Sequence, residues 1–307
     1  NNVRIRFQKP VLDEKVKRVF KLMGPAMIGA GVMHINLFAD LIIASLLDGG
    51  SISYLYYADR LNQLPLGVVG IAVGTALLPM LARAMEKEDK SESRNLFNRA
   101  LEYCLLLALP AAVALAMIPV QLITVLFERG AFTTSDSLMT SNVLAAYAIG
   151  LPAYITIKVF STAHWAHEDT VTPVKISVVA TLLNIIMSII LIQFIGVVGI
   201  AVGTAIAGWL QFAAHIHYLK DHSSAKLDKQ FKLVVGKIVM CSVVMGVGLL
   251  GLSLLLDNYI FSDVFLIKVL ALGALVVFGI IIYGALILGT RVVKLSDIKK
   301  YILKKGT

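Results

Sequence analysis

Eight long stretches of mostly apolar residues, separated by short polar segments, constrain the fold of this 307-residue chain more than any other feature. The hydrocarbon core of a bilayer is about 30 Å thick, so a helix that crosses it needs about 20 mostly apolar residues. Stretches of this kind occupy 23–47, 62–82, 100–119, 138–161, 176–195, 197–216, 238–256 and 269–289. Hydrophobic residues make up 58% of the chain, against roughly 45–50% in a soluble domain. The sequence therefore predicts an all-α, polytopic membrane bundle with eight transmembrane helices.

The placement of the basic residues predicts the orientation of this bundle. Of the 28 Lys and Arg residues, 24 lie before the first stretch, in every second gap, or after the eighth stretch. Basic loops stay on the cytoplasmic side, so both termini are expected to be cytoplasmic, although the gap between the fourth and fifth stretches contributes only Lys175. The net charge of +9 is thus interpreted as a topology signal, and no nucleic-acid partner is expected.

The decapeptide GVVGIAVGTA occurs twice, at Gly67–Ala76 and at Gly196–Ala205. Each copy carries two glycines four positions apart, Gly70 and Gly74 in the first and Gly199 and Gly203 in the second. Small residues at this spacing form a smooth strip on one face of a helix and let another helix approach closely. The pattern therefore predicts a helix-packing motif in both copies.

The stretch ahead of each copy carries a matching polar pair, Asn36 with Asp40 and Asn184 with Ser188. The two helical hairpins are therefore interpreted as diverged copies of one unit. The Gly motifs lie 129 positions apart and the Asn residues 148, so the first hairpin holds 19 more residues between Asn and Gly. The additional residues include Arg60, which has no counterpart in the second hairpin.

Arg60 lies at or just inside the mouth of the second stretch. A charge at this depth is tolerated where it faces a cavity, snorkels to the interface or pairs with a carboxylate. Its neighbour Asp59 points elsewhere, because consecutive helical residues diverge by about 100°. An Arg60 that faces a water-filled cavity would offer its planar fork to phosphate oxygens, whereas a snorkelling Arg60 would have no substrate role.

Asp40 is the only carboxylate well inside a predicted span, where an ionised and unpaired group costs several kcal/mol. It therefore needs a proton, a cation or a partner. Asn184, Ser188 and Thr204 supply further oxygens on the fifth and sixth spans, and hard oxygen ligands suit a small hard cation. The alternative for these three residues is ordinary hydrogen bonding between helices.

Motifs for catalysis are absent from the sequence, which contains no G-x-S-x-G, no Walker loop and no strand-linked G-x-G-x-x-G. His164 and His167 lie three positions apart, unlike the i, i+4 pair of a metalloprotease, so no transition-metal site is expected. The segment Phe127–Phe132, after Pro119, is predicted to form an amphipathic turn at the outer surface.

Three stretches together resemble a known family. They are YLYYADRLNQLPLGVVGIAVGTALLPMLA at 54–82, VLFERGAF at 125–132 and AHEDTVTPVKIS at 166–177. The sequence resembles the MurJ (MviN) family of lipid II flippases, within the multidrug/oligosaccharidyl-lipid/polysaccharide exporter superfamily. It matches the second part of such a protein, namely the second six-helix lobe and two additional C-terminal helices.

The resemblance implies a transporter rather than an enzyme. Such a protein moves the undecaprenyl-diphosphate-linked disaccharide-pentapeptide from the inner to the outer leaflet of the bacterial cytoplasmic (inner) membrane, for cell-wall synthesis, by alternating access between two lobes. Arg60, with Asp59 beside it, matches a cavity arginine that holds the diphosphate. Asp40, Asn184 and two hydroxyl residues match a sodium-binding cluster, so Na+ is the one cofactor implied. The two hydroxyl residues are Ser188 and Thr204. A more acidic version of this cluster exists in the family, and this chain departs from it by having Ser188.

The same resemblance implies the domain organisation and the partners. The implied parts are a cytoplasmic amphipathic segment (1–22), a six-helix transporter lobe (23–218), a cytoplasmic linker (219–237), two C-terminal helices with a groove for the lipid tail (238–290) and a basic cytoplasmic tail (291–307). The expected partners are lipid II, membrane lipids and the first six-helix lobe, which is missing from this sequence. The chain does not begin with Met, as expected for the later part of a longer protein.

Two other functions share these features. An ion-coupled exporter of drugs, or of another polyprenyl-linked glycan, would have the same fold and similar polar positions. A non-transporting membrane scaffold that recruits cell-wall enzymes through its basic loops would need neither Arg60 nor Asp40.

Overall fold

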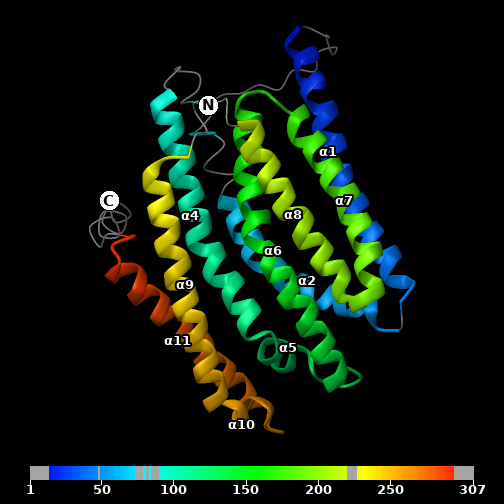
Figure 1. Ribbon diagram of the computed structural model, residues 1–307, viewed down its shortest axis with the longest axis vertical. Helices are drawn as coiled ribbons and strands as arrows, with labels where there is room; N and C mark the ends of the chain where they lie inside the picture. The colour runs from blue at the N-terminus through cyan, green and yellow to red at the C-terminus, as the bar shows by residue number, and fades with distance from the viewer. Residues whose placement is uncertain are drawn as a thin grey trace, which may run out of the picture.

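The computed structural model describes residues 14–47, 49–72, 79–80, 83, 90–219 and 227–293, and every regular element in these residues is a helix. The helices run side by side as a bundle with α9 and α11 along one flank (Figure 1). Their bounds are α1 (Glu14–Ser45), α2 (Ser51–Ala72), α4 (Lys90–Met117), α5 (Pro119–Phe127), α6 (Thr134–Ala166), α7 (Val171–Ile195), α8 (Val198–Leu219), α9 (Lys229–Leu255), α10 (Asp257–Ile260) and α11 (Phe265–Gly289).

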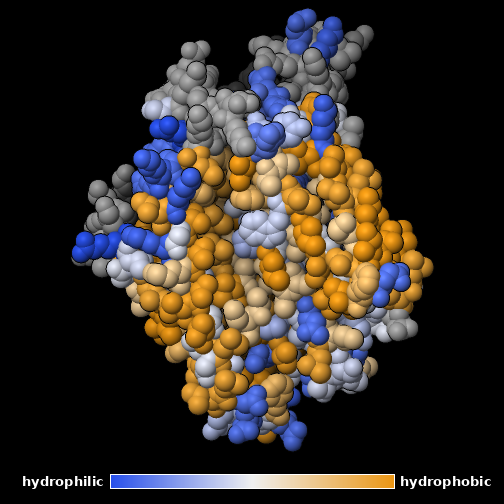
Figure 2. Space-filling view, in the orientation of Figure 1, coloured by the Kyte–Doolittle hydropathy of each residue, from blue (hydrophilic) through white to orange (hydrophobic). Residues whose placement is uncertain are grey.

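Six of these helices are long and apolar enough to cross a membrane: α4, α6, α7, α8, α9 and α11. They correspond to the third to eighth predicted spans, so the prediction of a polytopic helical membrane protein is confirmed. The first predicted span lies on α1, where His34–Ser45 is a shorter apolar stretch. The second, 62–82, begins on α2 and continues past Ala72 into positions outside the described residues. Figure 2 shows apolar side chains across the middle of the visible face and hydrophilic ones gathered at its two ends.

Several helix boundaries differ from the predicted spans for local reasons. The third predicted span, 100–119, is part of the longer helix α4, which begins at Lys90 because its polar first turns continue the helix beyond the apolar stretch. Proline disfavours the helical conformation of the residue before it, so the helix breaks at Ile118 and α5 starts at Pro119. Helix α9 begins at Lys229, inside the range 219–237 assigned to a linker, because the Asp228 side chain caps it.

Helix α6 is the most buried span and forms the centre of the lobe. It packs against α2, α4 and α8, whereas α1 packs mainly on α7 and α7 mainly on α8. The core along α6 includes Leu144, Leu151 and Ile155, none of which is exposed to solvent. Burial of most of its surface explains why α6 carries apolar residues around much of its circumference.

The C-terminal helices are attached to the lobe through polar contacts at one end of α4. Arg99 contacts Glu102 one turn further along α4, and its Nη2 donates to Asp228 at 2.9 Å, at the start of α9. The Tyr283 hydroxyl on α11 donates to the Leu106 carbonyl on α4 at 2.7 Å. Polar contacts therefore join both α9 and α11 to α4 of the lobe.

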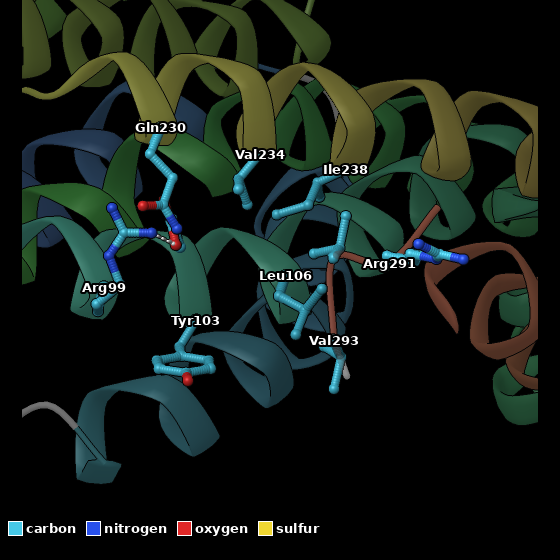
Figure 3. A pocket seen from close by; sticks show the side chains of 10 residues that line it. Arg99, Tyr103, Leu106, Gln230, Val234, Ile238, Arg291 and Val293 are labelled. Atoms are coloured by element: carbon cyan, nitrogen blue, oxygen red, sulfur yellow. Dashed lines mark hydrogen bonds and ion pairs between the residues drawn. The ribbon is translucent and has the colours of Figure 1, made fainter. Parts of the chain in front are cut away.

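A pocket of about 400 Å³ lies at this junction (Figure 3). Arg99, Tyr103 and Gln230 lie at one end of it, and Leu106, Val234, Ile238 and Val293 form its apolar side. The Arg99 guanidinium is paired with Glu102. The polar end of the pocket is thus occupied by an internal ion pair.

Candidate functional site

A cluster of polar side chains is buried between α1, α7 and α8. Asp40 on α1 is 7% exposed, and Asn184 and Ser188 on α7 are 1% and 0% exposed. The i, i+4 spacing on each helix places Asn36 one turn from Asp40 and Asn184 one turn from Ser188. Because α1 packs on α7, the two polar pairs that the sequence matched to each other meet at one interface.

Hydrogen bonds link the members of this cluster. The Asn184 amide donates to Asp40 Oδ1 at 3.0 Å and to Asn36 Oδ1 at 2.9 Å. Asn36 in turn donates to Asp40 Oδ2 at 3.3 Å, and the Ser188 hydroxyl donates to Asn184 Oδ1 at 3.3 Å. Both carboxylate oxygens of Asp40 therefore have amide donors, which offsets part of the cost of burying the group. Asn36 was interpreted only as a repeat marker in the sequence, and it belongs to this cluster.

Thr204 reaches the cluster from α8. Its hydroxyl donates to the Ile200 carbonyl at 2.8 Å and also lies close enough to interact with Asp40. The approach of α8 depends on Gly203, because a Cβ at this position would lie 2.8 Å from Ser188 Oγ and 3.3 Å from Asn184 Oδ1. The four residues predicted as an ion-binding set are therefore brought together by the structure, with a glycine of the repeated decapeptide beside them.

The donor set fits a small hard cation. It contains carboxylate, amide and hydroxyl oxygens in a buried place, which are the ligands such cations prefer. Among the residues that the structure describes, no Lys, Arg or His forms an ion pair with Asp40, and the side chains that donate to its oxygens are neutral amides. The described residues contain no group of three or more His, Cys, Asp or Glu that could hold a metal ion.

Arg60 lies on α2 with its guanidinium exposed. Its Nη2 donates to the Tyr56 hydroxyl at 2.6 Å, and Cζ lies 4.7 Å from the centre of the Tyr56 ring. A guanidinium at this distance is attracted by the face of the ring. Asp59 bonds instead to Gln63, so the two consecutive residues face different sides of the helix, as predicted. No ion pair joins Arg60 to Asp59 or to Asp40 within the described part of the chain.

Lys158 is a second cation near this face, and the sequence reasoning did not identify it as a site residue. It lies half-buried on α6 and its Nζ donates to the Leu66 carbonyl on α2 at 3.4 Å. A Cβ at Gly70 would lie 2.7 Å from this Nζ, so the first copy of the decapeptide makes room for a lysine. The sequence does indicate this residue, because Lys158 is a charge within an apolar span, where it is costly unless it faces a cavity or a partner.

Two tyrosines of α6, Tyr147 and Tyr154, lie in the same region as Asp40 and Asp59. The Tyr154 ring packs against Gly208, where a Cβ would lie 2.4 Å from it. We call the polar side chains described above, on α1, α2, α6, α7 and α8, the polar seam of the lobe.

The His164 motif has a structural role at the α6–α7 connection. His164 Nδ1 lies 3.0 Å from Asp169 Oδ2, and Asp169 Oδ1 accepts from the backbone N–H groups of Val171 and Thr172. Partial burial would raise the pKa of Asp169, but the hydrogen bonds from Thr172 and His164 outweigh it and hold this pKa below its usual value. The acid therefore fixes the start of α7.

Comparison with known proteins places this arrangement in a family. The family model described as "Lipid II flippase MurJ" matches residues 2–270. The chain belongs to the MurJ family. It is 43% identical over 208 residues to the "Probable lipid II flippase MurJ" of Rhizobium meliloti (strain 1021), a match that covers 68% of this chain and 39% of that protein. It is 35% identical over 229 residues to the same-named protein of Rickettsia prowazekii (strain Madrid E), covering 75% and 45% of the two chains.

Solved structures show the same relationship at the level of the fold. The structure described as "Lipid II flippase MurJ, inward closed conformation" superimposes with a TM-score of 0.67 at 31% identity, covering 91% of this chain and 57% of that one. An outward-facing MATE family transporter of the MOP superfamily superimposes with a TM-score of 0.57 at 18% identity, which shows a shared fold. The family and the six apolar helices together indicate a multi-pass bacterial membrane protein of a transporter family. The chain spans less than half the length of the two MurJ relatives named above.

Proposed function

We propose that this chain is the second lobe, with the two additional C-terminal helices, of a lipid II flippase of the bacterial inner membrane. The chain would span the membrane eight times, with α1 and α2 as its first two spans and both termini in the cytoplasm. The basic residues at alternate connections support this topology. A first six-helix lobe, from the part of the relatives that this chain does not match, would complete the transporter.

The observation that carries this proposal is the state of Arg60. Its guanidinium is exposed on α2, is held over the Tyr56 ring, and forms no ion pair with a carboxylate among the described residues. An arginine has five N–H donors, and the contact with Tyr56 uses only part of them. The remaining donors can bind two oxygens of a diphosphate at once, which a lysine ammonium cannot do with the same geometry.

Lys158 supports the same role from α6, the helix that packs on α2. Its half-buried ammonium reaches only one carbonyl, at 3.4 Å, and that contact leaves two of its three N–H donors for another acceptor. Two cations on neighbouring helices would attract an anionic head group into the space between this lobe and the first. Movement of the first lobe relative to this one would then expose that space to one membrane face at a time.

The Asp40 cluster would bind the coupling ion. Asp40, Asn184, Ser188 and Thr204 would be the ligands of Na+, and the ion would supply a positive charge beside the Asp40 carboxylate. The structure supports this role through the buried oxygens that meet there from α1, α7 and α8. Because the cluster joins α1 to α7, binding at this position would favour conformations in which these helices stay together.

The C-terminal helices would accommodate the lipid tail. Helices α9 and α11 carry many exposed apolar side chains, including Val243, Val247, Ile280 and Ile281. A surface of this kind is compatible with acyl or prenyl chains as neighbours.

Binding by the purified protein in nanodiscs tests the substrate assignment. The protein is this chain fused behind the first lobe of a MurJ relative, and the probes are lipid II, an unrelated polyprenyl-linked glycan and a cationic drug. We expect lipid II alone to bind, and Arg60→Ala to weaken its binding at least about ten-fold. Arg60→Lys should be impaired too, and Lys268→Ala, which removes a cation from α11, serves as the matched control. Equal binding of all three probes would favour the exporter function instead.

A further inference from the structure

A second pocket, of about 550 Å³, lies between the start of α2 and the turn that joins α5 to α6. Its lining includes four aromatic side chains, one basic and one acidic side chain, namely Tyr54, Tyr57, Phe127, Phe132, Arg129 and Asp136. The turn appears at the lower end of the bundle in Figure 1, at the opposite end of α6 from the α6–α7 connection. By the distribution of the basic residues this is the non-cytoplasmic end. The turn at Phe127–Phe132, which the sequence predicts at the outer surface, forms part of the pocket lining.

The pocket is held in shape by contacts within its walls. The Tyr54 hydroxyl donates to Asp136 Oδ1 at 2.7 Å, which ties α2 to α6. Asp136 Oδ2 accepts from the backbone and side chain of Thr133, so the first turn of α6 is capped. Gly50 has a φ of +101° and a Cβ there would lie 2.6 Å from the Tyr54 hydroxyl, so only glycine fits. A site with fixed walls loses little conformational entropy when it binds a ligand.

Arg129 is a cation available to an external anion. It is exposed, and both nearby acids are engaged elsewhere: Glu128 accepts from Thr134 and Ser137, at 3.3 and 2.6 Å, and Asp136 accepts from the groups described above. Within the described residues no carboxylate pairs with the Arg129 guanidinium. The pocket therefore offers an unpaired arginine beside aromatic side chains.

A row of aromatic rings leads from Arg60 to this pocket. The Arg60 guanidinium lies 4.7 Å from the Tyr56 ring, the Tyr56 and Tyr57 rings lie 5.9 Å apart, and Tyr57 packs on Phe127 at 4.8 Å. Tyr57 precedes Arg60 by three residues, which is about 4.5 Å along the helix axis. A ligand bound to Arg60 through a phosphate group can therefore extend along α2 into the pocket without leaving the protein surface.

We propose that this outer pocket binds the sugar–peptide part of the head group. A sugar ring would pack its C–H face on the Tyr57 and Phe127 rings, since the negative face of an aromatic ring attracts C–H groups. A peptide carboxylate would pair with the Arg129 fork. The inference rests on the proposed function, because that function supplies the head group. It assigns the sugar–peptide part to the outer pocket, whereas the proposed function assigns the diphosphate to Arg60.

A soluble probe separates this site from the diphosphate site. The probe is the disaccharide-pentapeptide without diphosphate or lipid, and saturation-transfer NMR on the fused protein in nanodiscs measures its dissociation constant. We expect binding that Arg129→Gln weakens at least about ten-fold and that Arg60→Ala leaves unchanged. Tyr57→Leu should weaken it as well, whereas Tyr57→Phe, which keeps the ring, should not. Lys268→Gln is the matched control for the loss of one positive charge.

Each result has a defined meaning. Absence of probe binding, or binding that Arg129→Gln does not change, would overturn the outer pocket while leaving the Arg60 site intact. Equal binding of the bare pentapeptide would overturn the packing of a sugar on Tyr57. Lipid II binding that Arg60→Ala does not weaken, together with probe binding that Arg129→Gln does weaken, would instead contradict the proposed diphosphate site. The melting temperature of each variant shows whether a loss of binding reflects unfolding.

Discussion

The two copies of the decapeptide occupy different surroundings although their ten residues are identical. In the second copy, Gly199 and Gly203 pack against α7, where a Cβ at Gly199 would lie 2.6 Å from the Leu191 carbonyl carbon. In the first copy, Gly70 faces α6 and the flexible end of Lys158. Gly74, the last glycine of the first packing motif, lies outside the described residues. The comparison teaches that the glycine pattern provides space, and that the neighbouring helix decides whether this space holds backbone, a polar cluster or a cation.

The largest expected effect comes from the buried cluster beside the second copy. Asn184→Leu removes the amide that donates to Asp40 and Asn36, and leaves a buried carboxylate with fewer donors, so we expect a loss of about 3 kcal/mol in stability. Ser188→Ala, which removes one hydrogen bond at 3.3 Å, should cost less than about 1 kcal/mol. Thermal unfolding in detergent measures both. Equal losses would show that Asn184 does not organise the cluster.

A matched pair of glycine substitutions tests the comparison itself. Gly199→Ala places a methyl group against the α7 backbone, which cannot move without repacking, and should cost about 2 kcal/mol. Gly70→Ala, at the equivalent position of the first copy, meets only the Lys158 ammonium, which can swing away, and should cost less than about 1 kcal/mol. The melting temperatures of the two variants give the answer. A reversed order would contradict the assignment of backbone packing to the second copy alone.

The dependence of the melting temperature on Na+ should further distinguish the Asp40 cluster from the region around Arg60. If Na+ binds at Asp40, a concentration ten times its dissociation constant stabilises the protein by about 1.4 kcal/mol. We expect the melting temperature to rise with Na+ but not with an equal concentration of K+. Asp40→Asn should abolish this rise, whereas Arg60→Gln, on the first hairpin, should retain it. A rise that persists in Asp40→Asn would place the ion elsewhere.

The smallest expected effect lies at the α6–α7 connection, ahead of the second hairpin. The pKa of Asp169 is lower in the folded protein than in the unfolded chain, so its stabilisation is present above the unfolded value of about 3.9 and is lost as the pH falls through the folded value. Asp169→Asn should therefore cost less than about 1 kcal/mol at pH 7, since the side chain is one third exposed, and nothing at strongly acid pH. Asp263→Asn is the control. A cost that does not vary with pH would exclude this explanation.

The bundle could be predicted from the sequence because apolar length alone defines the spans from α4 onward. The position where α4 ends depended on Pro119, whose effect on Ile118 is local and was readable. The predicted amphipathic turn at 127–132 falls at the junction of α5 and α6, where capping by Thr133 and Asp136 begins the next helix. These features depend on residues near each other in the chain.

The candidate site was less accessible to sequence reasoning because it depends on which helices are neighbours. Asp40, Asn184, Ser188 and Thr204 were proposed as one set by polarity and family resemblance, and the packing of α1 and α8 on α7 is what joins them. Lys158 is not among the predicted site residues, since nothing in the sequence shows that α6 packs on α2. Likewise, the outer pocket joins residues of α2 and α6 that are 82 positions apart, such as Tyr54 and Asp136.

The most direct test of the central claim is translocation of lipid-linked precursor in bacterial cells depleted of their own lipid II flippase. The cells express this chain alone, the chain fused behind a first lobe of the MurJ family, or the fusion carrying either Arg60→Ala or Asp40→Ala. We predict that only the unmodified fusion restores translocation and growth. Rescue by the fusion with Arg60→Ala and with Asp40→Ala would contradict the polar seam as the transport site and favour a scaffold. Rescue by this chain alone would contradict the two-lobe account.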